Sequence, residues 1–234
     1  MEKNIIWVVA ILAIVVVIIA GLWAYNDSMS PQGRFVATLT DAAKDLNGVT
    51  QINVTIDSVR AQNDANAWVT LDSTQQTVDL LQLKRDGSKV VIADLNIPAT
   101  NYNQIELNIS KVIVVDASGS HEAKLPSNKI RINMDVNLAK ESTSVASLDV
   151  LADESLHVTG NGLYILAPVI HIQTMENARV EIDLENHAVI IGGKLKNDIK
   201  VGMDENGNVG INVNIPKDTE ISIGNDNKIH VGLN

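Results

Sequence analysis

The strongest constraint on this chain is an uninterrupted apolar segment near its N-terminus. Residues 5–25 read IIWVVAILAIVVVIIAGLWAY and contain no charged residue, amide, Pro, Ser or Thr. Because a helix rises about 1.5 Å per residue, this segment reaches across the roughly 30 Å hydrocarbon core of a bilayer. The sequence therefore predicts one N-terminal transmembrane helix over residues 5–25, which makes the membrane a partner of the chain.

The length and flanks of this segment are typical of an uncleaved signal-anchor. A cleaved signal peptide has an apolar core of about 7–15 residues and ends in a small-x-small site, whereas here Leu22 stands two positions before Ala24. Trp7 and Trp23 lie near the two ends, where aromatic rings favour the headgroup level. With Lys3 on the short side, the positive-inside rule favours a cytoplasmic N-terminus and an extracytoplasmic C-terminal domain. Removal as a signal peptide is the alternative.

After a polar stalk at residues 26–33, the hydrophobic pattern has a period of two. Alternating apolar residues occur in several runs, among them 52–56, 105–109 and 130–136. Turn-forming pairs such as Asn47-Gly48 separate these runs, with at most a helical turn or two expected at 41–47 and 78–84. Short strands without long amphipathic helices predict an all-β fold. We expect an antiparallel β-sandwich of immunoglobulin or prealbumin type over residues 34–173.

Residues 174–234 are expected to form a different β-structure, because one pattern is written three times. The three units are RVEIDLENHAVIIGG, DIKVGMDENGNVGINVNIP and EISIGNDNKIHVGLN. Each consists of an alternating strand, an Asn/Asp/Gly turn and a second alternating strand, which predicts a hairpin. This C-terminal β-hairpin meander either extends the sandwich or forms a small second layer, and a short solenoid is the alternative.

A series of short motifs occurs in a fixed order over residues 34–173. They are Leu39-Thr40-Asp41-Ala42, Trp68-Val69-Thr70-Leu71, Thr77-Val78-Asp79-Leu80-Leu81-Gln82-Leu83, Ile97-Pro98, Tyr102-Asn103-Gln104-Ile105-Glu106-Leu107, Leu148-Asp149, Ser155 and Tyr164-Ile165-Leu166-Ala167-Pro168-Val169-Ile170. In this order the segment resembles the domain of unknown function 4382 family of secreted or lipid-anchored prokaryotic domains. The resemblance implies a β-sandwich on the cell exterior and brings no catalytic residues. Thr100 departs from the Gly usual in the family's P-x-G-x-Y turn.

Six residues of these motifs are candidates for structural roles, namely Asp41, Trp68, Asp79, Tyr102, Tyr164 and Pro168. Asp79 is placed to bond backbone N–H groups at a turn, and the leucines that follow it to plug one end of the sandwich. Tyr102 follows a Pro-initiated turn and precedes a strand, the setting of a tyrosine corner. Trp68 is expected to cover the core.

The sequence offers no recognisable catalytic constellation. Its five histidines are His121, His157, His171, His187 and His230, and none stands in an HxH or HExxH pattern. There is no Cys for a thiolate site and no GxSxG, GxGxxG or GxxxxGKS stretch. We therefore expect no catalytic residue, no cofactor and no enzymatic activity.

Two kinds of modification or ligand site remain as weaker candidates. One turn resembles half of a calcium loop but lacks the distal Glu, and its candidate ligands are Asp204, Asn206 and Asn208; a plain hairpin turn also explains it. Three N-x-S/T sequons make Asn26, Asn53 and Asn108 glycosylation candidates. In the period-two pattern Asn53 and Asn108 point away from the apolar face.

Charge and composition narrow the functional classes. The net charge of −10 would repel nucleic-acid phosphates, so we expect no nucleic-acid partner. Few aromatic residues follow the anchor, which argues against a sugar-binding face. The leading expectation is a non-enzymatic, membrane-anchored cell-surface or envelope protein acting in adhesion, envelope structure or partner binding. One alternative is a filament or surface-array subunit that self-associates by β-strand addition. Another is an exterior hydrolase or calcium-dependent binding module.

Overall fold

The computed structural model describes residues 15, 17, 31–41, 46, 48–203, 209–211, 220–223 and 229–232. Most of the predicted transmembrane segment and stalk lies outside these residues, as do four candidate site residues, namely Asn26, Asp204, Asn206 and Asn208. Among the described residues, no helix is both long and apolar enough to cross a membrane. Strand β1 (Gln32–Thr40) begins within the predicted stalk, so Gln32 and Gly33 belong to a sheet.

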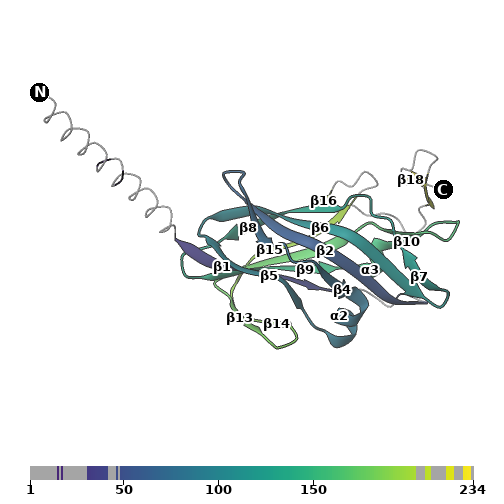
Figure 1. Cartoon of the computed structure of the whole chain (residues 1–234), viewed down its shortest axis with the longest axis horizontal. Helices are drawn as coiled ribbons and strands as arrows, with labels where there is room; N and C mark the ends of the chain where they lie inside the picture. Colours follow the sequence, from purple (N-terminus) through teal and green to yellow (C-terminus); the bar gives the residue numbers. More distant parts are fainter. Residues whose placement is uncertain are drawn as a thin grey trace, which may run out of the picture.

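The described part of the chain is all-β, as the sequence predicted, and contains two large sheets. Sheet 1 has the strand order β16 (Val209–Ile211), β15 (Lys194–Met203), β12 (Val169–Glu176), β9 (Thr143–Val150), β1 and β5 (Val90–Pro98). Sheet 2 has the order β3 (Trp68–Asp72), β2 (Val49–Asn63), β6 (Asn101–Asp116) and β7 (Gly119–Glu122), with β4 (Gln76–Asp79) also paired to β2 and β8 (Lys129–Asn137) to β6. Figure 1 shows the long ribbons of β2 and β6 in front of β9.

Smaller elements complete the part of the architecture that the structure describes. Three two-stranded sheets are formed by β10 (Leu156–Val158) with β11 (Tyr164–Leu166), β13 (Arg179–Ile182) with β14 (Ala188–Ile191), and β17 (Glu220–Ile223) with β18 (Ile229–Gly232). Two short helices, α2 (Leu80–Asp86) and α3 (Ala152–Ser155), connect strands.

One strand pair departs from the expected antiparallel arrangement. Strands β1 and β9 run parallel, with Phe35 opposite Ser144, whereas the other pairs in the described parts of the two large sheets are antiparallel. Parallel neighbours need a long crossover connection. Here the crossover contains the whole of sheet 2, because sheet 2 is built from residues between β1 and β9. Sheet 1 is therefore mixed.

Both large sheets contribute to one apolar core, which the alternating pattern placed correctly. In β8 the buried residues are Ile130, Ile132, Met134 and Val136, and the residues between them are exposed. They pack in the same cluster as Phe35 of β1 and Ile172 of β12, which come from sheet 1. Successive side chains of a strand point to opposite faces, so this alternation directs one face of β8 inward.

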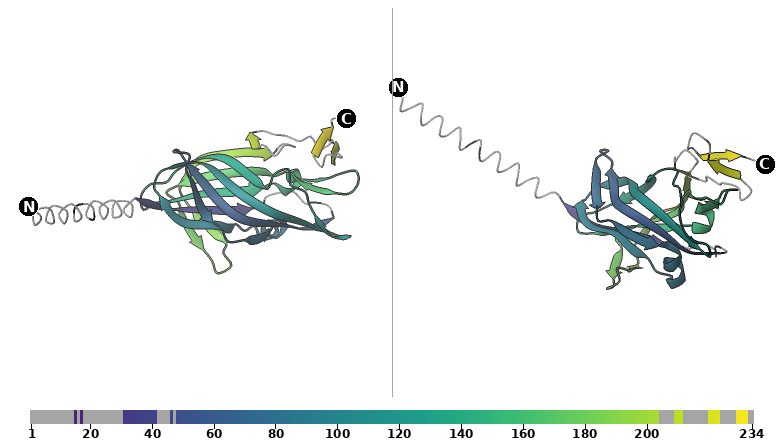
Figure 2. Two further views of the ribbon diagram at one scale, coloured as in Figure 1. Left: turned by 45° about the horizontal axis from the view of Figure 1, so that its top comes forward. Right: turned by 45° about the vertical axis from the view of Figure 1, so that its right-hand side comes forward.

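The C-terminal segment forms the three predicted hairpins, and each has a different place. Hairpin β15–β16 extends sheet 1 through the pairing of β15 with β12. Hairpin β13–β14 covers the outer face of sheet 1, where Val180 and Ala188 pack against Val36 and Val145. It projects from the lower side of the body in both views of Figure 2. Hairpin β17–β18 forms a two-stranded sheet of its own.

Helix α2 confirms the role expected of Asp79. The Asp79 side chain is the N-cap of α2 and accepts a hydrogen bond from the Leu81 backbone N–H at 3.1 Å. The same Oδ1 atom accepts from the Ile52 N–H of β2, also at 3.1 Å. Leu80 and Leu83 of α2 are buried in the shared core. The cap therefore fixes the helix to sheet 2 as its leucines close one end of the core.

Tyr102 makes the contact expected of a tyrosine corner. Its ring is buried and meets the ring of Phe35 edge to face, with the centroids 5.8 Å apart. Its hydroxyl donates a hydrogen bond to the Pro98 carbonyl at 2.9 Å. Burial raises the pKa of Tyr102 to about 12. The side chain thus joins the β5–β6 turn to the core.

We expect wild-type stability to fall at alkaline pH through Tyr102. The phenol keeps its proton in the folded state up to about pH 12, whereas an unfolded Tyr ionises near pH ~10. The protonated phenol of Tyr102 therefore contributes its full share to the free energy of unfolding below the unfolded pKa. This share is lost as pH rises through the folded pKa. Linkage gives a loss of roughly 2 kcal/mol between about pH 9 and about pH 12. Urea unfolding followed by circular dichroism across this range measures it.

The matched variant is Tyr102→Phe, which keeps the ring and removes the hydroxyl. At neutral pH it should be less stable than wild type by about 1 kcal/mol, because the hydrogen bond to Pro98 is lost. Above about pH 10 the gap should close and then reverse, to about 1 kcal/mol in favour of the variant near pH 12, since Phe does not titrate. Equal alkaline losses in the two proteins would contradict the assignment to Tyr102.

Candidate functional site

The outer face of sheet 2 carries four interacting side chains, Arg60, Trp68, Glu106 and Arg131, which we call the Trp68 cluster. Glu106 of β6 stands opposite Arg60 of β2 and Arg131 of β8 in the strand register. Directly opposite residues project from the same face of a sheet. The neighbours of Glu106 along β6 are buried in the core, so the cluster points away from it.

Glu106 is held by both arginines. Its Oε1 lies 3.2 Å from Arg60 Nη1, and its Oε2 lies 2.6 Å from Arg131 Nε. The carboxylate side chain is only 2% exposed, whereas the side chains of Arg60 and Arg131 are 33% and 53% exposed. A carboxylate on an outer face is buried here because longer side chains cover it. Ionised pairs of this kind favour one fixed geometry when their hydrogen bonds are made.

Trp68 lies over the arginines and does not cover the core, which corrects the expectation from the sequence. The Cζ atoms of Arg60 and Arg131 are 4.9 and 5.6 Å from the centre of its ring, within cation–π range. Its neighbours Val69 and Leu71 are the β3 residues that contact the core. Since side chains alternate along a strand, Trp68 must point outward. The alternation of Trp68-Val69-Thr70-Leu71, with polar Thr70, could have signalled this orientation.

Amide side chains surround the Trp68 cluster on the same face. Gln62 stands opposite Trp68 in the register, and its Nε2 donates to the Asn66 carbonyl at 3.2 Å. Gln104 Nε2 donates to Asn133 Oδ1 at 2.9 Å. The region combines a partly exposed indole, two guanidinium groups and several hydrogen-bonding amides. It has the chemistry of a recognition surface.

A second polar cluster joins the β6–β7 turn to β11. Asp116 Oδ1 accepts from Ser118 Oγ at 2.7 Å and lies 3.1 Å from His121 Nε2, while its Oδ2 accepts from the Tyr164 hydroxyl at 2.7 Å. These hydrogen bonds, foremost that of Ser118, hold the pKa of Asp116 well below its ordinary value. The bond to Asp116 also raises the pKa of Tyr164.

This cluster has the residue types of a hydrolase triad without its arrangement. In a triad, the carboxylate and the nucleophile contact different ring nitrogens of the histidine. Here Ser118 Oγ, at 2.8 Å, and Asp116 both contact His121 Nε2. Asp116 also accepts from the Ser118 and Gly119 backbone N–H groups, as a turn cap does. The geometry is that of a hairpin turn fastened to Tyr164, which places this motif residue in a structural contact.

The other candidate residues lie apart from one another. Asp41 is buried, and its Oδ1 accepts from the Ala152 N–H at 3.3 Å. The Pro168 carbonyl accepts from the Met203 N–H at 3.0 Å. Asn53 and Asn108 are partly exposed between buried neighbours. They lie on the outer face of sheet 2, as the sequence indicated.

The remaining described histidines do not converge on a common site. His171 pairs with Asp198, and His187 lies 3.5 Å from Asp183. His157 is partly buried, which lowers its pKa, and its Nε2 has no hydrogen-bond partner. Across the described ranges, no group of three acidic or histidine side chains is arranged to hold a metal ion.

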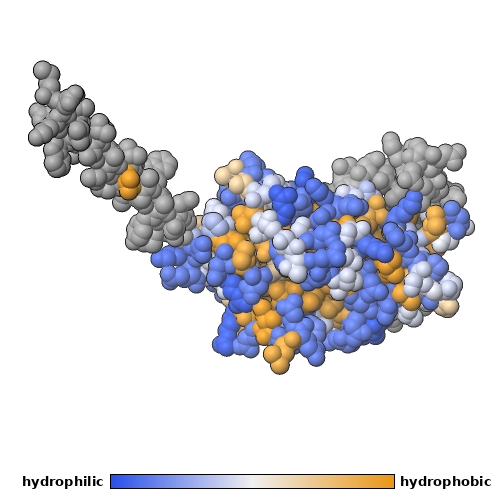
Figure 3. Space-filling view, viewed as in Figure 1, coloured by the Kyte–Doolittle hydropathy of each residue, from blue (hydrophilic) through white to orange (hydrophobic). Residues whose placement is uncertain are grey.

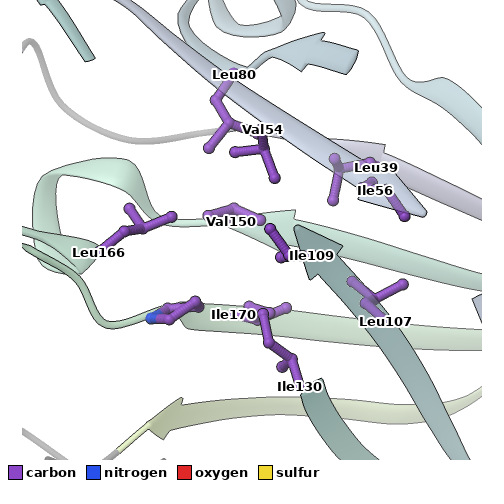
Figure 4. Close-up of a pocket in the computed structure, with 11 residues that line it drawn as sticks. Leu39, Val54, Ile56, Leu80, Leu107, Ile109, Ile130, Val150, Leu166 and Ile170 are labelled. Atoms are coloured by element: carbon purple, nitrogen blue, oxygen red, sulfur yellow. The ribbon is translucent and has the colours of Figure 1, made fainter. Parts of the chain in front are cut away.

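A small apolar cavity lies between the two large sheets. Its volume is about 20 Å³, and its walls include Val54 and Ile109 of sheet 2, Val150 and Ile170 of sheet 1, and Leu80 of α2. Figure 4 shows these side chains converging from both sheets. A space of this size holds about one water molecule, and an apolar lining favours leaving it dry. The cavity is a packing gap, too small for an organic ligand.

The surface over the large sheets and the surface near hairpin β13–β14 differ in polarity. Figure 3 shows mostly blue and white atoms over β2 and β6 and more orange atoms toward the hairpin. The exposed apolar residues of that region include Leu184, Val189 and Ile191. The Trp68 cluster, on the outer face of sheet 2, combines a partly exposed indole with two guanidinium groups and neighbouring amides.

The comparison with known families agrees with the order of motifs in the chain. The family described as Domain of unknown function (DUF4382) matches residues 32–168, which is more than half of the chain. Neither a curated protein nor a solved structure matches this chain. The match begins at β1 and ends at Pro168, just before β12, and it contains all four residues of the Trp68 cluster. The chain belongs to the DUF4382 family.

Proposed function

We propose that this protein is a non-enzymatic binding protein of the cell surface or envelope. Residues 5–25 anchor it in the membrane with the N-terminus in the cytoplasm, and an extracytoplasmic β-sandwich presents the Trp68 cluster to a partner. The observation that carries the proposal is the cluster itself: a partly exposed Trp68 and two arginines fixed over the buried Glu106. Fixed aromatic and Arg side chains are typical of binding hot spots.

The fold supports a scaffold role for the domain. Two six-stranded sheets share one apolar core, which favours a β-sandwich. The core side chains face inward, so outer-face residues such as Trp68 can vary in chemistry without disturbing it. A rigid sheet also holds a recognition group in place more firmly than a loop does.

Side chains cap two sheet edges, β8 and β5, and argue against strand addition at these edges. On β8, the Asp135 N–H donates to Asn197 Oδ1 at 2.9 Å, and the Asn137 N–H donates to Glu176 Oε1 at 3.1 Å. On β5, Gln76 Nε2 donates to the Ile92 carbonyl at 3.0 Å. An added strand at β8 or β5 would have to displace these side chains, which are typical devices against edge-to-edge pairing.

The location is tested with the full chain carrying a C-terminal tag. We expect the protein in the membrane fraction after carbonate washing, and we expect external protease to remove the tag from intact cells. The variant Val15→Arg with Val17→Arg should release the chain from the membrane, because each Arg near the helix centre costs about 2.5–3.5 kcal/mol. The matched control, Val189→Arg at an exposed strand position, should stay bound. A wild-type tag protected from external protease would overturn the topology.

A further inference from the structure

We infer that the Trp68 cluster binds a saccharide chain that carries carboxylate groups. This inference rests on the proposed binding function and names its ligand class. It also reverses the expectation, drawn from the few aromatic residues that follow the anchor, that the domain has no sugar-binding face. That expectation assumed that Trp68 covers the core, whereas its indole lies on the outer face of sheet 2 and is partly exposed.

Charge selects an acidic ligand. The chain as a whole carries a net charge of −10, yet the Trp68 cluster combines two guanidinium groups with one carboxylate. The cluster therefore carries one formal positive charge on an acidic molecule. Such a patch attracts a polyanion, while the surrounding acidic surface discourages contact elsewhere.

The arginines retain donors for that ligand. Arg131 contacts Glu106 through Nε alone, and its two terminal nitrogens make no hydrogen bond with any described residue. Arg60 contacts Glu106 through Nη1. A guanidinium fork matches a carboxylate with two parallel N–H···O bonds. Because the buried Glu106 already orders both side chains, a ligand would spend less free energy on ordering them.

The indole and the amides select a sugar over a plain polyanion. One face of a pyranose ring presents C–H groups, which pack on an aromatic ring, and Trp is the largest such platform. Gln62, Gln104 and Asn133 lie on the same outer face as Trp68 and offer donors and acceptors for hydroxyl groups. An acidic peptide would use the arginines but has no need of the ring. Dependence on Trp68 therefore separates the two ligand classes.

The test measures binding of the full chain, held in nanodiscs of zwitterionic lipid, to oligogalacturonate by isothermal titration calorimetry. Neutral dextran oligosaccharides and polyglutamate are compared in parallel. We expect oligogalacturonate to bind, with an affinity that falls as salt rises. Trp68→Ala should weaken this binding roughly tenfold, and Trp68→Phe should restore part of it. Arg131→Lys, which keeps the charge but loses the fork, should also weaken it.

The matched control is Arg179→Lys, which makes the same change at an exposed Arg paired with Glu181 on β13, away from sheet 2. It should bind as wild type does, and circular dichroism should show every variant folded. Absence of oligogalacturonate binding at millimolar concentration would overturn the ligand class. Membrane attachment and protease exposure would still report on the proposed function separately. Equal binding of polyglutamate, unchanged in Trp68→Ala, would reduce the interaction to simple charge attraction and also overturn it.

Discussion

Replacing both arginines of the Trp68 cluster, Arg60→Met with Arg131→Met, should lower the free energy of unfolding by about 3–5 kcal/mol. Glu106 is 2% exposed and is hydrogen-bonded by both guanidinium groups. Without them a buried carboxylate keeps its desolvation cost and loses its compensating charges. Met retains much of the apolar stem of Arg, so lost packing contributes little. Urea unfolding of the full chain, followed by circular dichroism, measures the loss.

Two controls separate this effect from a general loss of surface arginines. The triple variant that adds Glu106→Leu should recover most of the stability, because it removes the charge that was left unpaired. Arg179→Met, which breaks the exposed pair with Glu181, should change stability by less than about 0.5 kcal/mol. If the double variant were as stable as Arg179→Met, the two arginines would not stabilise the buried Glu106 carboxylate.

Local patterns predicted the parts of this fold that depend on neighbouring residues. The period-two runs gave the buried faces correctly, as β8 illustrates with Ile130 to Val136. Each C-terminal hairpin followed from its own turn and flanking strands. The cap at Asp79 and the corner at Tyr102 rest on hydrogen bonds to nearby turns, so the motif around each residue carried enough information.

Pairings between distant strands were not visible in the sequence. Nothing in the pattern of β1 or β9 shows that the two run parallel, because alternation is the same in either direction. Two strand pairings bring Arg60, Glu106 and Arg131 side by side. A third, of β2 with β3, places Trp68 beside them. Each residue alone reads as an ordinary outer-face position. Their convergence is a property of the register.

The same reasoning explains the second polar cluster and the capped edges. Ser118 and His121 are close in sequence, but Tyr164 reaches Asp116 from another hairpin. The side chains that cap β8 come from sheet 1, including Asn197 of β15. Such contacts form where two separately specified surfaces meet. The sequence shows which residues form each surface. It does not show which other surface of the chain will pack against them.

Among core residues, truncation of Phe35, the single Phe of the chain, should lower the free energy of unfolding most. Phe35→Ala is expected to lower the free energy of unfolding by about 3–5 kcal/mol. The ring is fully buried and packs edge to face on Tyr102, so truncation removes a large apolar contact and leaves a cavity that sheets on both sides cannot fill. Urea unfolding of the full chain at neutral pH measures it.

The size of this loss distinguishes a shared core from two sheets that are stable separately. Phe35→Leu should cost less than Phe35→Ala, because it keeps part of the buried volume. Leu195→Ala, at a half-exposed position of sheet 1, should cost less than about 1 kcal/mol. If Phe35→Ala cost no more than Leu195→Ala, Phe35 would not join the sheets. Phe35 of sheet 1 contacts Tyr102 of sheet 2. If Phe35→Ala loses the expected free energy of unfolding and still unfolds in one cooperative transition, the two sheets unfold together.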